Sequence, residues 1–234
     1  MPAAATTPTL GLPPHIAACL FDLDGVITQT ATVHAQAWKQ TLDPISPFDP
    51  VKDYDEYVDG KPRVEGIRSF LAGRHIALPE EQVQELAERK DHLFLDLIHE
   101  RGVQTYESSV RYLEAARAAG KKLAVVSSSK NTTEVLRTAA LDHFFDAQVD
   151  GNVAEKEHLQ GKPAPDTYVR AAQMLRTPPE HSAVYEDALA GVEAGRAGHF
   201  GLVVGIDRAG QAEALRSHGA DVVVRDLEEL LQPA

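Results

Sequence analysis

The chain is poor in cysteine: Cys19 is the only one among its 234 residues. A single cysteine excludes an intrachain disulfide framework and is typical of proteins in a reducing compartment, so we expect a cytoplasmic protein. Cys19 stands within an apolar run, "IAACLF". We therefore interpret it as a small core residue, with a catalytic thiol as the less favoured alternative.

Long apolar runs and positive charge are also scarce. No stretch reaches the 18 apolar residues of a membrane span, so we expect no membrane partner. Residues 1–14 lack the basic and apolar regions of a secretory signal, and we expect them to form a loose tail. The net charge is −12, which argues against nucleic acid or an anionic membrane surface as the main partner. Nothing in the sequence demands an oligomer, and we expect a monomer.

The pattern of apolar segments predicts an α/β protein. Residues 16–22 form a short apolar run, typical of a buried strand. Residues 33–103 show helical spacing and no strand signal, whereas strands and helices alternate after Gly102. Alternation of this kind indicates a parallel, Rossmann-like sheet covered by helices on both faces. We expect a core domain of residues 15–32 plus 104–234, with a helical cap domain, residues 33–103, inserted after the first strand.

Polar residues follow the predicted strands, at the sheet edge where α/β proteins bind ligands. Asp22 and Asp24 follow the first strand, and the other strand ends supply Ser127, Ser128, Ser129, Lys130, Asn131, Lys162, Glu186 and Asp187. Neither a P-loop nor a dinucleotide-binding fingerprint occurs, so nucleotide hydrolysis and hydride transfer have no support. The convergence of acids, lysines and hydroxyl groups is more specific than any single motif.

These residue types suit phosphoryl transfer through a carboxylate. Asp22, fixed by a rigid strand, is placed to attack a phosphoryl group, and Asp24 to move the proton of an attacking or leaving oxygen. Lys162 and the Ser127 hydroxyl would hold the transferring phosphoryl group.

Acids crowded in this way require a cation, and hard oxygen ligands favour Mg²⁺. We expect Asp22, Asp187 and the main-chain carbonyl of Asp24 as its ligands, with Glu186 acting through water.

Each motif has a simpler interpretation when it is taken alone. "DLDG" could begin a calcium loop, but an EF-hand needs glycine and glutamate where Ile27 and Val33 stand. The pair Glu186–Asp187 could simply be acids at a helix N-terminus, "SSSKN" a helix cap, and "GKPAP" a turn. The occurrence of all of them at successive strand ends favours a catalytic site.

The segments "FDLDGV", "VVSSSKN", "GKPAPD" and "VYEDALAGVEAG" resemble, in order, the four motifs of the haloacid dehalogenase superfamily of aspartate-nucleophile phosphotransferases. The inserted helices resemble the small α-helical cap of that superfamily. The resemblance implies an HAD-like core, an aspartyl-phosphate enzyme and a magnesium ion.

Within the superfamily, nearly the whole chain resembles the β-phosphoglucomutase subfamily. That resemblance assigns substrate-binding roles to Thr30, His34, Gly60, Arg63, Lys90, Ser128, Ser129, Lys130 and Asn131. It implies interconversion of β-glucose 1-phosphate and glucose 6-phosphate through a 1,6-bisphosphate, with a phosphorylated sugar as the binding partner.

The chain departs from the subfamily pattern at three positions. Gln29 replaces a usual aspartate, Asp59 stands where a lysine often precedes the cap glycine, and Ala188 stands where serine is frequent. Lys61 could replace the missing lysine charge, so we include it among the substrate-binding residues. Two alternatives stay open: a Mg²⁺-dependent phosphatase of a small sugar or sugar-alcohol phosphate, and a non-catalytic relative, which the intact set of acids and Lys162 argues against.

Overall fold

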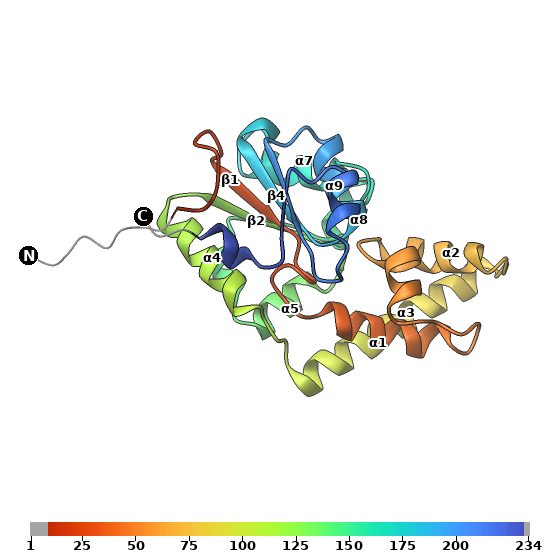
Figure 1. Ribbon diagram of the computed structural model, residues 1–234. Helices are drawn as coiled ribbons and strands as arrows, with labels where there is room; N and C mark the ends of the chain where they lie inside the picture. Colours follow the sequence, from red (N-terminus) through yellow and green to blue (C-terminus); the bar gives the residue numbers. More distant parts are fainter. Residues whose placement is uncertain (1–8, 232–234) are drawn as a thin grey trace, which may run out of the picture.

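The computed structural model describes residues 9–231 and contains one six-stranded parallel sheet (Figure 1). The strand order is β3-β2-β1-β4-β5-β6. The strands are β1 (Ala18–Phe21), β2 (Lys122–Val126), β3 (Ala147–Val149), β4 (Ser182–Glu186), β5 (Leu202–Ile206) and β6 (Val222–Val224). The predicted α/β class with a parallel sheet is confirmed. The order places β1 at the centre, between β2 and β4, so three strand ends that carry polar residues lie side by side.

Helices cover both faces of the sheet, as the apolar strands require. Cys19 and Phe21 of β1 face α4 (Glu107–Ala118) and α5 (Thr132–Thr138). Ala18 and Leu20, one residue out of phase, face α7 (Asp166–Met174), α8 (Leu189–Ala197) and α9 (Ala212–Ser217). Alternate side chains of one strand thus enter two separate apolar layers.

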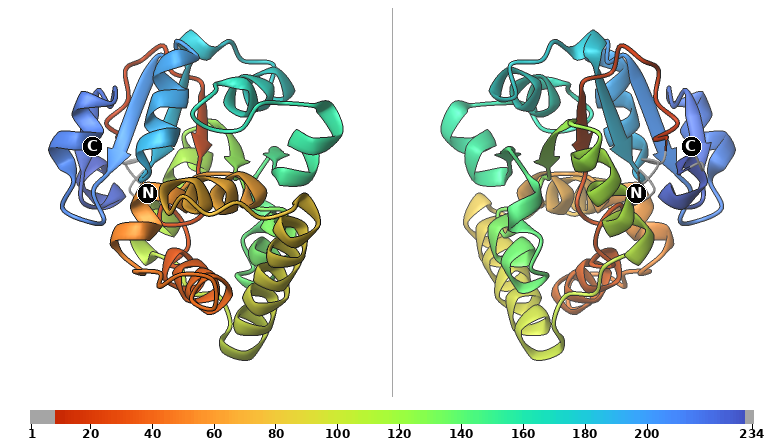
Figure 2. Two further views of the ribbon diagram at one scale, coloured as in Figure 1. Left: turned by 90° about the vertical axis from the view of Figure 1, so that its right-hand side faces the viewer. Right: turned by 90° about the vertical axis from the view of Figure 1, so that its left-hand side faces the viewer.

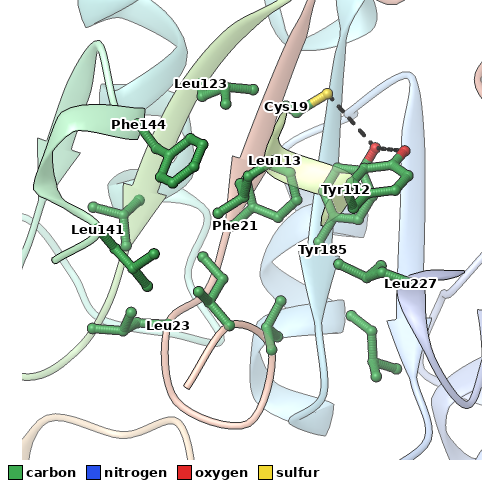
Figure 3. Close-up of a cluster of buried hydrophobic side chains, with 14 of the residues drawn as sticks. Cys19, Phe21, Leu23, Tyr112, Leu113, Leu123, Leu141, Phe144, Tyr185 and Leu227 are labelled. Atoms are coloured by element: carbon green, nitrogen blue, oxygen red, sulfur yellow. Dashed lines mark hydrogen bonds between the residues drawn. The ribbon is translucent and has the colours of Figure 1, made fainter. Parts of the chain in front are cut away.

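The layer between the sheet and α4 contains a small polar network (Figure 3). The hydroxyl groups of Tyr112 and Tyr185 lie 2.8 Å apart, and the Tyr185 hydroxyl lies 3.6 Å from the Cys19 sulfur. Burial raises the pKa of the Cys19 thiol to about 12. Cys19 is therefore a neutral core residue, as its position in the apolar run predicts.

Three helices form a unit beyond the carboxyl end of the sheet (Figures 1 and 2). They are α1 (Ala31–Leu42), α2 (Arg63–Gly73) and α3 (Glu80–Arg101), and they enclose an apolar cluster of their own around Trp38, Phe48 and Phe70. The chain leaves the core after β1 and returns before α4. The outgoing and returning segments pair through a bridge between Thr28 and Thr105 and a hydrogen bond from the Gln29 nitrogen to the Gln104 carbonyl.

Some local predictions differ from the structure. The predicted tail of residues 1–14 includes Leu10, which is buried in the core and whose carbonyl accepts a hydrogen bond from Tyr112. The loose tail is therefore wrong at Leu10 and Leu12, whose apolar side chains pack against the core. Residues 1–8 lie outside the described residues. The segment of residues 43–62 before α2, which is rich in proline and aspartate, contains a π-helix, Tyr54–Val58. A helix not predicted, α6 (Gly151–Glu157), follows β3. Four short 3₁₀ or π turns complete the order: η1 (Tyr54–Val58), η2 (Asp142–Phe144), η3 (Pro179–His181) and η4 (Leu227–Leu230). Within residues 9–231, no helix is both long and apolar enough to cross a membrane.

Candidate active site

Asp22 directly follows β1, and the central position of that strand fixes it at the carboxyl edge of the sheet. Its main-chain nitrogen donates a hydrogen bond to the Tyr185 carbonyl of the neighbouring strand β4. The residue is 7% exposed. Burial raises the pKa of the Asp22 carboxyl, and the nearby Lys162 ammonium opposes that rise. A carboxylate in this place is rigid, nearly dry and partly neutralised by a cation.

Lys162 is the buried cation of the site. Its Nζ lies 2.5 Å from a carboxylate oxygen of Asp22 and 2.5 Å from one of Glu186, and it donates a 3.2 Å hydrogen bond to the Val126 carbonyl. Burial by itself would lower the pKa of Lys162, but the two carboxylates outweigh burial and raise it. Lys162 is therefore held as an ammonium between two strand ends.

Asp22, Glu186 and Asp187 form a cluster that can hold a metal ion. Each of the three offers a carboxylate oxygen within 4.8 Å of the others. Two buried acids, one half-buried acid and the cation Lys162 leave an excess of negative charge at the cluster, and desolvation together with the neighbouring acids raises the pKa of Asp187. A hard divalent cation fits this set, because it would bind the carboxylate oxygens and balance their charge.

The main chain beside the cluster leaves no room for a side chain. Gly25 has a φ of +87°, and a Cβ placed on it would overlap the Asp187 carboxylate. Only glycine satisfies both conditions. The glycine of "DLDG" is thus part of the geometry that brings the β1 loop against Asp187.

Asp24 lies where the core meets the inserted helices. Thr30 donates a hydrogen bond to its Oδ1, and Nε2 of His34, in α1, lies 3.3 Å from the same oxygen. Burial of Asp24 would raise the pKa of its carboxyl, but His34 and Thr30 together lower it to about 2. Asp24 is therefore a carboxylate at neutral pH.

His34 is itself held by Lys90 from α3. The Lys90 Nζ lies 2.5 Å from Nδ1 of His34, and the His34 ring stacks on Phe94 at 4.0 Å between centroids. Burial and the charge of Arg63 lower the pKa of Lys90 to about 7. Asp24, His34 and Lys90 form a polar chain that runs from the core into the helical unit.

A cavity of about 660 Å³ separates the helical unit from the sheet edge. It brings together most of the predicted site residues, namely Asp22, Asp24, His34, Gly60, Lys61, Arg63, Lys90, Ser127, Ser128, Ser129, Lys130, Glu186 and Asp187. The Ser128 hydroxyl donates a 2.7 Å hydrogen bond to the Gly60 carbonyl across this boundary. The helical unit therefore touches the core loop that follows β2.

Three predicted site residues do not line the cavity. Lys162 lies behind Asp22 and Glu186, Thr30 lies behind Asp24, and the Asn131 side chain donates to Asp91 in α3. Two others line it but direct their amines elsewhere: Lys61 to the Glu56 carbonyl and the Ser69 hydroxyl, and Lys130 to Glu155. The Lys61 amine thus points into the helical unit.

Tyr168 is a site residue that sequence reasoning did not find. Its hydroxyl donates a 2.8 Å hydrogen bond to Glu186, and the Lys162 Nζ lies 5.0 Å from its ring centroid. It stands in α7 among core residues, and only its distance from Glu186 in space reveals the contact.

Asp59 lies in the cavity wall at the position where the β-phosphoglucomutase subfamily often carries lysine. Burial, with the charges of Glu186 and Asp55, raises the pKa of this carboxyl to about 7. The cavity wall therefore carries a weak acid at this position instead of a cation.

Comparison with known proteins identifies the family to which the chain belongs. Residues 16–199 match the model of the haloacid dehalogenase-like hydrolases. The chain is 50% identical to a β-phosphoglucomutase of Mycobacterium tuberculosis, over 95% of this chain and 94% of the relative. It is 36% identical to the β-phosphoglucomutase of Bacillus subtilis, over 91% of each chain.

A solved structure shares the fold. The β-phosphoglucomutase of Clostridium difficile superposes with a TM-score of 0.78 at 28% identity, over 92% of this chain and 93% of that one. The family match covers most of the chain and contains the carboxylates, the lysine and the serine loop described above. The chain belongs to the haloacid dehalogenase-like hydrolase family.

Proposed function

We propose that the protein is a β-phosphoglucomutase, which interconverts β-glucose 1-phosphate and glucose 6-phosphate through a β-glucose 1,6-bisphosphate. The identity to β-phosphoglucomutases over nearly the full chain supports this assignment. The observation that carries it is the chain Asp24–His34–Lys90, which couples the acid/base residue of the core to helices α1 and α3. A mutase needs such coupling, because its phosphoenzyme must transfer the phosphoryl group to a sugar hydroxyl and react only slowly with water.

We propose a core domain of residues 15–32 plus 104–234 and a cap domain of residues 33–103. The cap then closes the cavity over the sheet edge, and His34 approaches Asp24 only when the cap is shut. This arrangement would align the proton-transfer group when sugar phosphate, and not water alone, occupies the cavity.

In the first half of the reaction, the phosphoryl group starts on Asp22. The 6-hydroxyl oxygen of β-glucose 1-phosphate attacks the phosphorus, and the bond from phosphorus to the Asp22 oxygen breaks. The Asp24 carboxylate takes the hydroxyl proton; its low pKa in the free enzyme keeps it ionised, so that it has a site free to accept the proton. The products are the bisphosphate, the free Asp22 carboxylate and a protonated Asp24.

In the second half, the bisphosphate presents its 1-phosphoryl group to Asp22. The Asp22 oxygen attacks the phosphorus, the bond to the sugar O1 breaks, and Asp24 returns its proton to O1. Glucose 6-phosphate leaves and the phosphoenzyme is restored, so protons and phosphoryl groups balance over the cycle. Lys162 and Ser127 would hold the transferring oxygens, as their positions beside Asp22 allow.

We propose Mg²⁺ as the cation of the acidic cluster. Asp22, Asp187 and the Asp24 carbonyl would bind it directly, with Glu186 acting through water, because Glu186 already pairs with Lys162 and Tyr168. When bound, the ion would neutralise charge that develops on the phosphoryl oxygens.

The sugar phosphate would bind in the cavity between the two domains. Arg63 and Gly60 would meet the phosphate that is not transferred, while Ser128, Ser129 and Lys90 would lie around the sugar. Lys61, Lys130 and Asn131, which bind Ser69, Glu155 and Asp91 in this structure, would have to turn toward the cavity to contact the substrate. An acidic protein with a net charge of −12 would thereby gather its cations where the anionic substrate binds.

A product analysis tests the proposal. The protein is incubated with Mg²⁺, β-glucose 1-phosphate and a trace of β-glucose 1,6-bisphosphate, and both glucose 6-phosphate and free phosphate are measured. We expect glucose 6-phosphate to form in large excess over phosphate. Release of phosphate without isomerisation would contradict the proposal and would identify the protein as a sugar phosphate phosphatase.

A further inference from the structure

Asp91 of α3 joins two residues that come from different parts of the molecule. Its Oδ1 accepts a hydrogen bond from Nη2 of Arg63 at 2.5 Å and another from Nδ2 of Asn131 at 2.6 Å. Arg63 begins α2, whereas Asn131 precedes α5 in the core. A single carboxylate oxygen therefore links two helices of the inserted unit to the core loop that follows β2.

Asp91 stands behind the cavity wall. Arg63 lines the cavity, but Asp91 and Asn131 do not. The Nη1 atom of Arg63 donates to the Ala87 carbonyl, one turn before Asp91 on the same helix. Both terminal nitrogens of the guanidinium are thus held by α3, while the side chain still faces the cavity.

The contact is stronger than an ordinary surface ion pair. The side chains of Arg63 and Asp91 are only 19% and 27% exposed. Charge-assisted hydrogen bonds that are partly shielded from water are roughly twice as strong as neutral ones, and they fix direction as well as distance. An arginine side chain that moved freely would lose much of its rotamer freedom when the substrate binds, and this loss would weaken binding.

We propose that Asp91 is a positioning residue for substrate binding, which acts through Arg63. It holds the guanidinium toward the cavity before the sugar phosphate arrives, and its bond from Asn131 ties the same carboxylate to the core where the inserted helices lie against it. The proposal rests on the proposed function, since it gives Arg63 the phosphate that is not transferred. Pre-organisation of this kind lowers the KM and leaves the chemical step nearly unchanged.

Steady-state kinetics of Asp91→Ala with β-glucose 1-phosphate test the proposal. We expect the KM to rise about tenfold, the size of effect that charge-assisted hydrogen bonds have on binding, while kcat changes by less than about threefold. Asp91→Asn keeps the shape and one acceptor oxygen but loses the charge, so we expect a smaller rise of about threefold. It also serves if the alanine variant does not fold. Asp96→Asn, an exposed acid on the same helix, is the matched control and should leave the KM unchanged.

A double-mutant cycle separates this role from a merely structural one. If Asp91 acts through Arg63, Asp91→Ala should lower kcat/KM in the wild-type background and have no further effect in an Arg63→Ala background. An unchanged KM in both Asp91 variants, or an equal loss in the two backgrounds, would overturn the proposal. The proposed function fails by a different result, a wild-type protein that releases phosphate without isomerisation. In that case the KM read from phosphate release still decides the role of Asp91.

Discussion

Two aspartates separated by one residue have opposite environments. Asp22 is buried beside Lys162 and Glu186, the last residue of β4, and its pKa is raised. Asp24 lies between Thr30 and His34, and its pKa is lowered to about 2. Enzymes assign separate roles to neighbouring acids by this kind of difference in surroundings. Here the position of each side chain, and not its pKa, carries the proposed roles. Asp22 lies beside Lys162, which can balance charge during attack on phosphorus, and Asp24 lies beside His34 of the helical unit, where we propose that it transfers the proton.

Asp22→Asn should abolish turnover and phosphoenzyme formation, because an amide cannot attack phosphorus and give an acyl phosphate. The measurement is mass spectrometry of the protein after exposure to the bisphosphate, together with an assay of glucose 6-phosphate. Asp142→Asn, an exposed acid in η2, is the control and should behave as wild type. Substantial activity in Asp22→Asn would mean that another residue carries the phosphoryl group.

Asp24→Asn should still bind hexose phosphate but turn it over about 10² to 10⁴ times more slowly, the usual range for loss of a general acid or base. The hydrogen bond from Thr30 can still be accepted by the amide oxygen, so the local structure should survive. Binding is measured by calorimetry and turnover by the isomerisation assay. Turnover at the wild-type rate would refute proton transfer by Asp24.

The pattern of strands identifies site residues that follow a strand, but it does not identify Tyr168 and Asp91, which contact the site from helices. Asp22, Lys162 and Asp187 could be grouped because parallel strand ends meet at one edge of a sheet. Tyr168 resembles an ordinary core residue of an amphipathic helix, and Asp91 resembles a solvated charge. Their contacts with Glu186 and Arg63 join positions far apart in the sequence, and no local periodicity encodes them.

The sequence predicts the helices and strands that bury an apolar face, because burial leaves a hydrophobic pattern. The strand β1 is fully buried, and its apolar run is visible in the sequence. The helix α6 has no buried residue, so it leaves no hydrophobic periodicity; Asp150 caps it instead by accepting hydrogen bonds from Asn152 and Val153. The π-helix Tyr54–Val58 lies in a segment rich in proline and aspartate, a composition that predicts irregular structure and not a helix.

The buried Lys90 of α3 should make the stability of the folded protein depend on pH. Burial places its pKa at about 7 in the folded protein, below the usual value of 10.5. Between these values the unfolded chain holds the proton and the folded chain does not, so the unfolding free energy should rise with pH from about 7 to 10.5. One group contributes at most about 1.4 kcal/mol per pH unit.

The variant Lys90→Met should lack this contribution. Urea unfolding of both proteins at several pH values from 7 to 10 gives the difference between their unfolding free energies. We expect that difference to shift in favour of the wild type as pH rises. A difference that is independent of pH would contradict the low pKa of Lys90.

At the scale of the whole molecule, the helical unit and the sheet edge enclose one site. The fold class and the inserted helical block could be predicted because alternation begins only after Gly102. How the block lies against the core could not, because it depends on contacts such as Ser128 with Gly60 and Asn131 with Asp91. These contacts join segments separated by long stretches of chain, and they define the cavity where the chemistry is proposed.

Removal of divalent metal should stop the reaction and lower the thermal stability. A chelator is expected to abolish turnover, and Mg²⁺ should restore it. A ligand present at about 100 times its Kd stabilises a protein by about 2.7 kcal/mol, which a melting curve detects. Asp187→Asn should lose most of this stabilisation, because the cluster loses one of its three carboxylates. Full turnover after chelation would contradict a metal site in the acidic cluster.

The central claim is that the closed cap directs the phosphoryl group from Asp22 to a sugar hydroxyl and not to water. The most direct measurement follows ³²P from the isolated phosphoenzyme in the presence and absence of β-glucose 1-phosphate. We predict that without sugar the label leaves slowly as inorganic phosphate, whereas with sugar it moves rapidly into the bisphosphate and glucose 6-phosphate. Loss of the label to water at the same rate in both experiments would contradict the account.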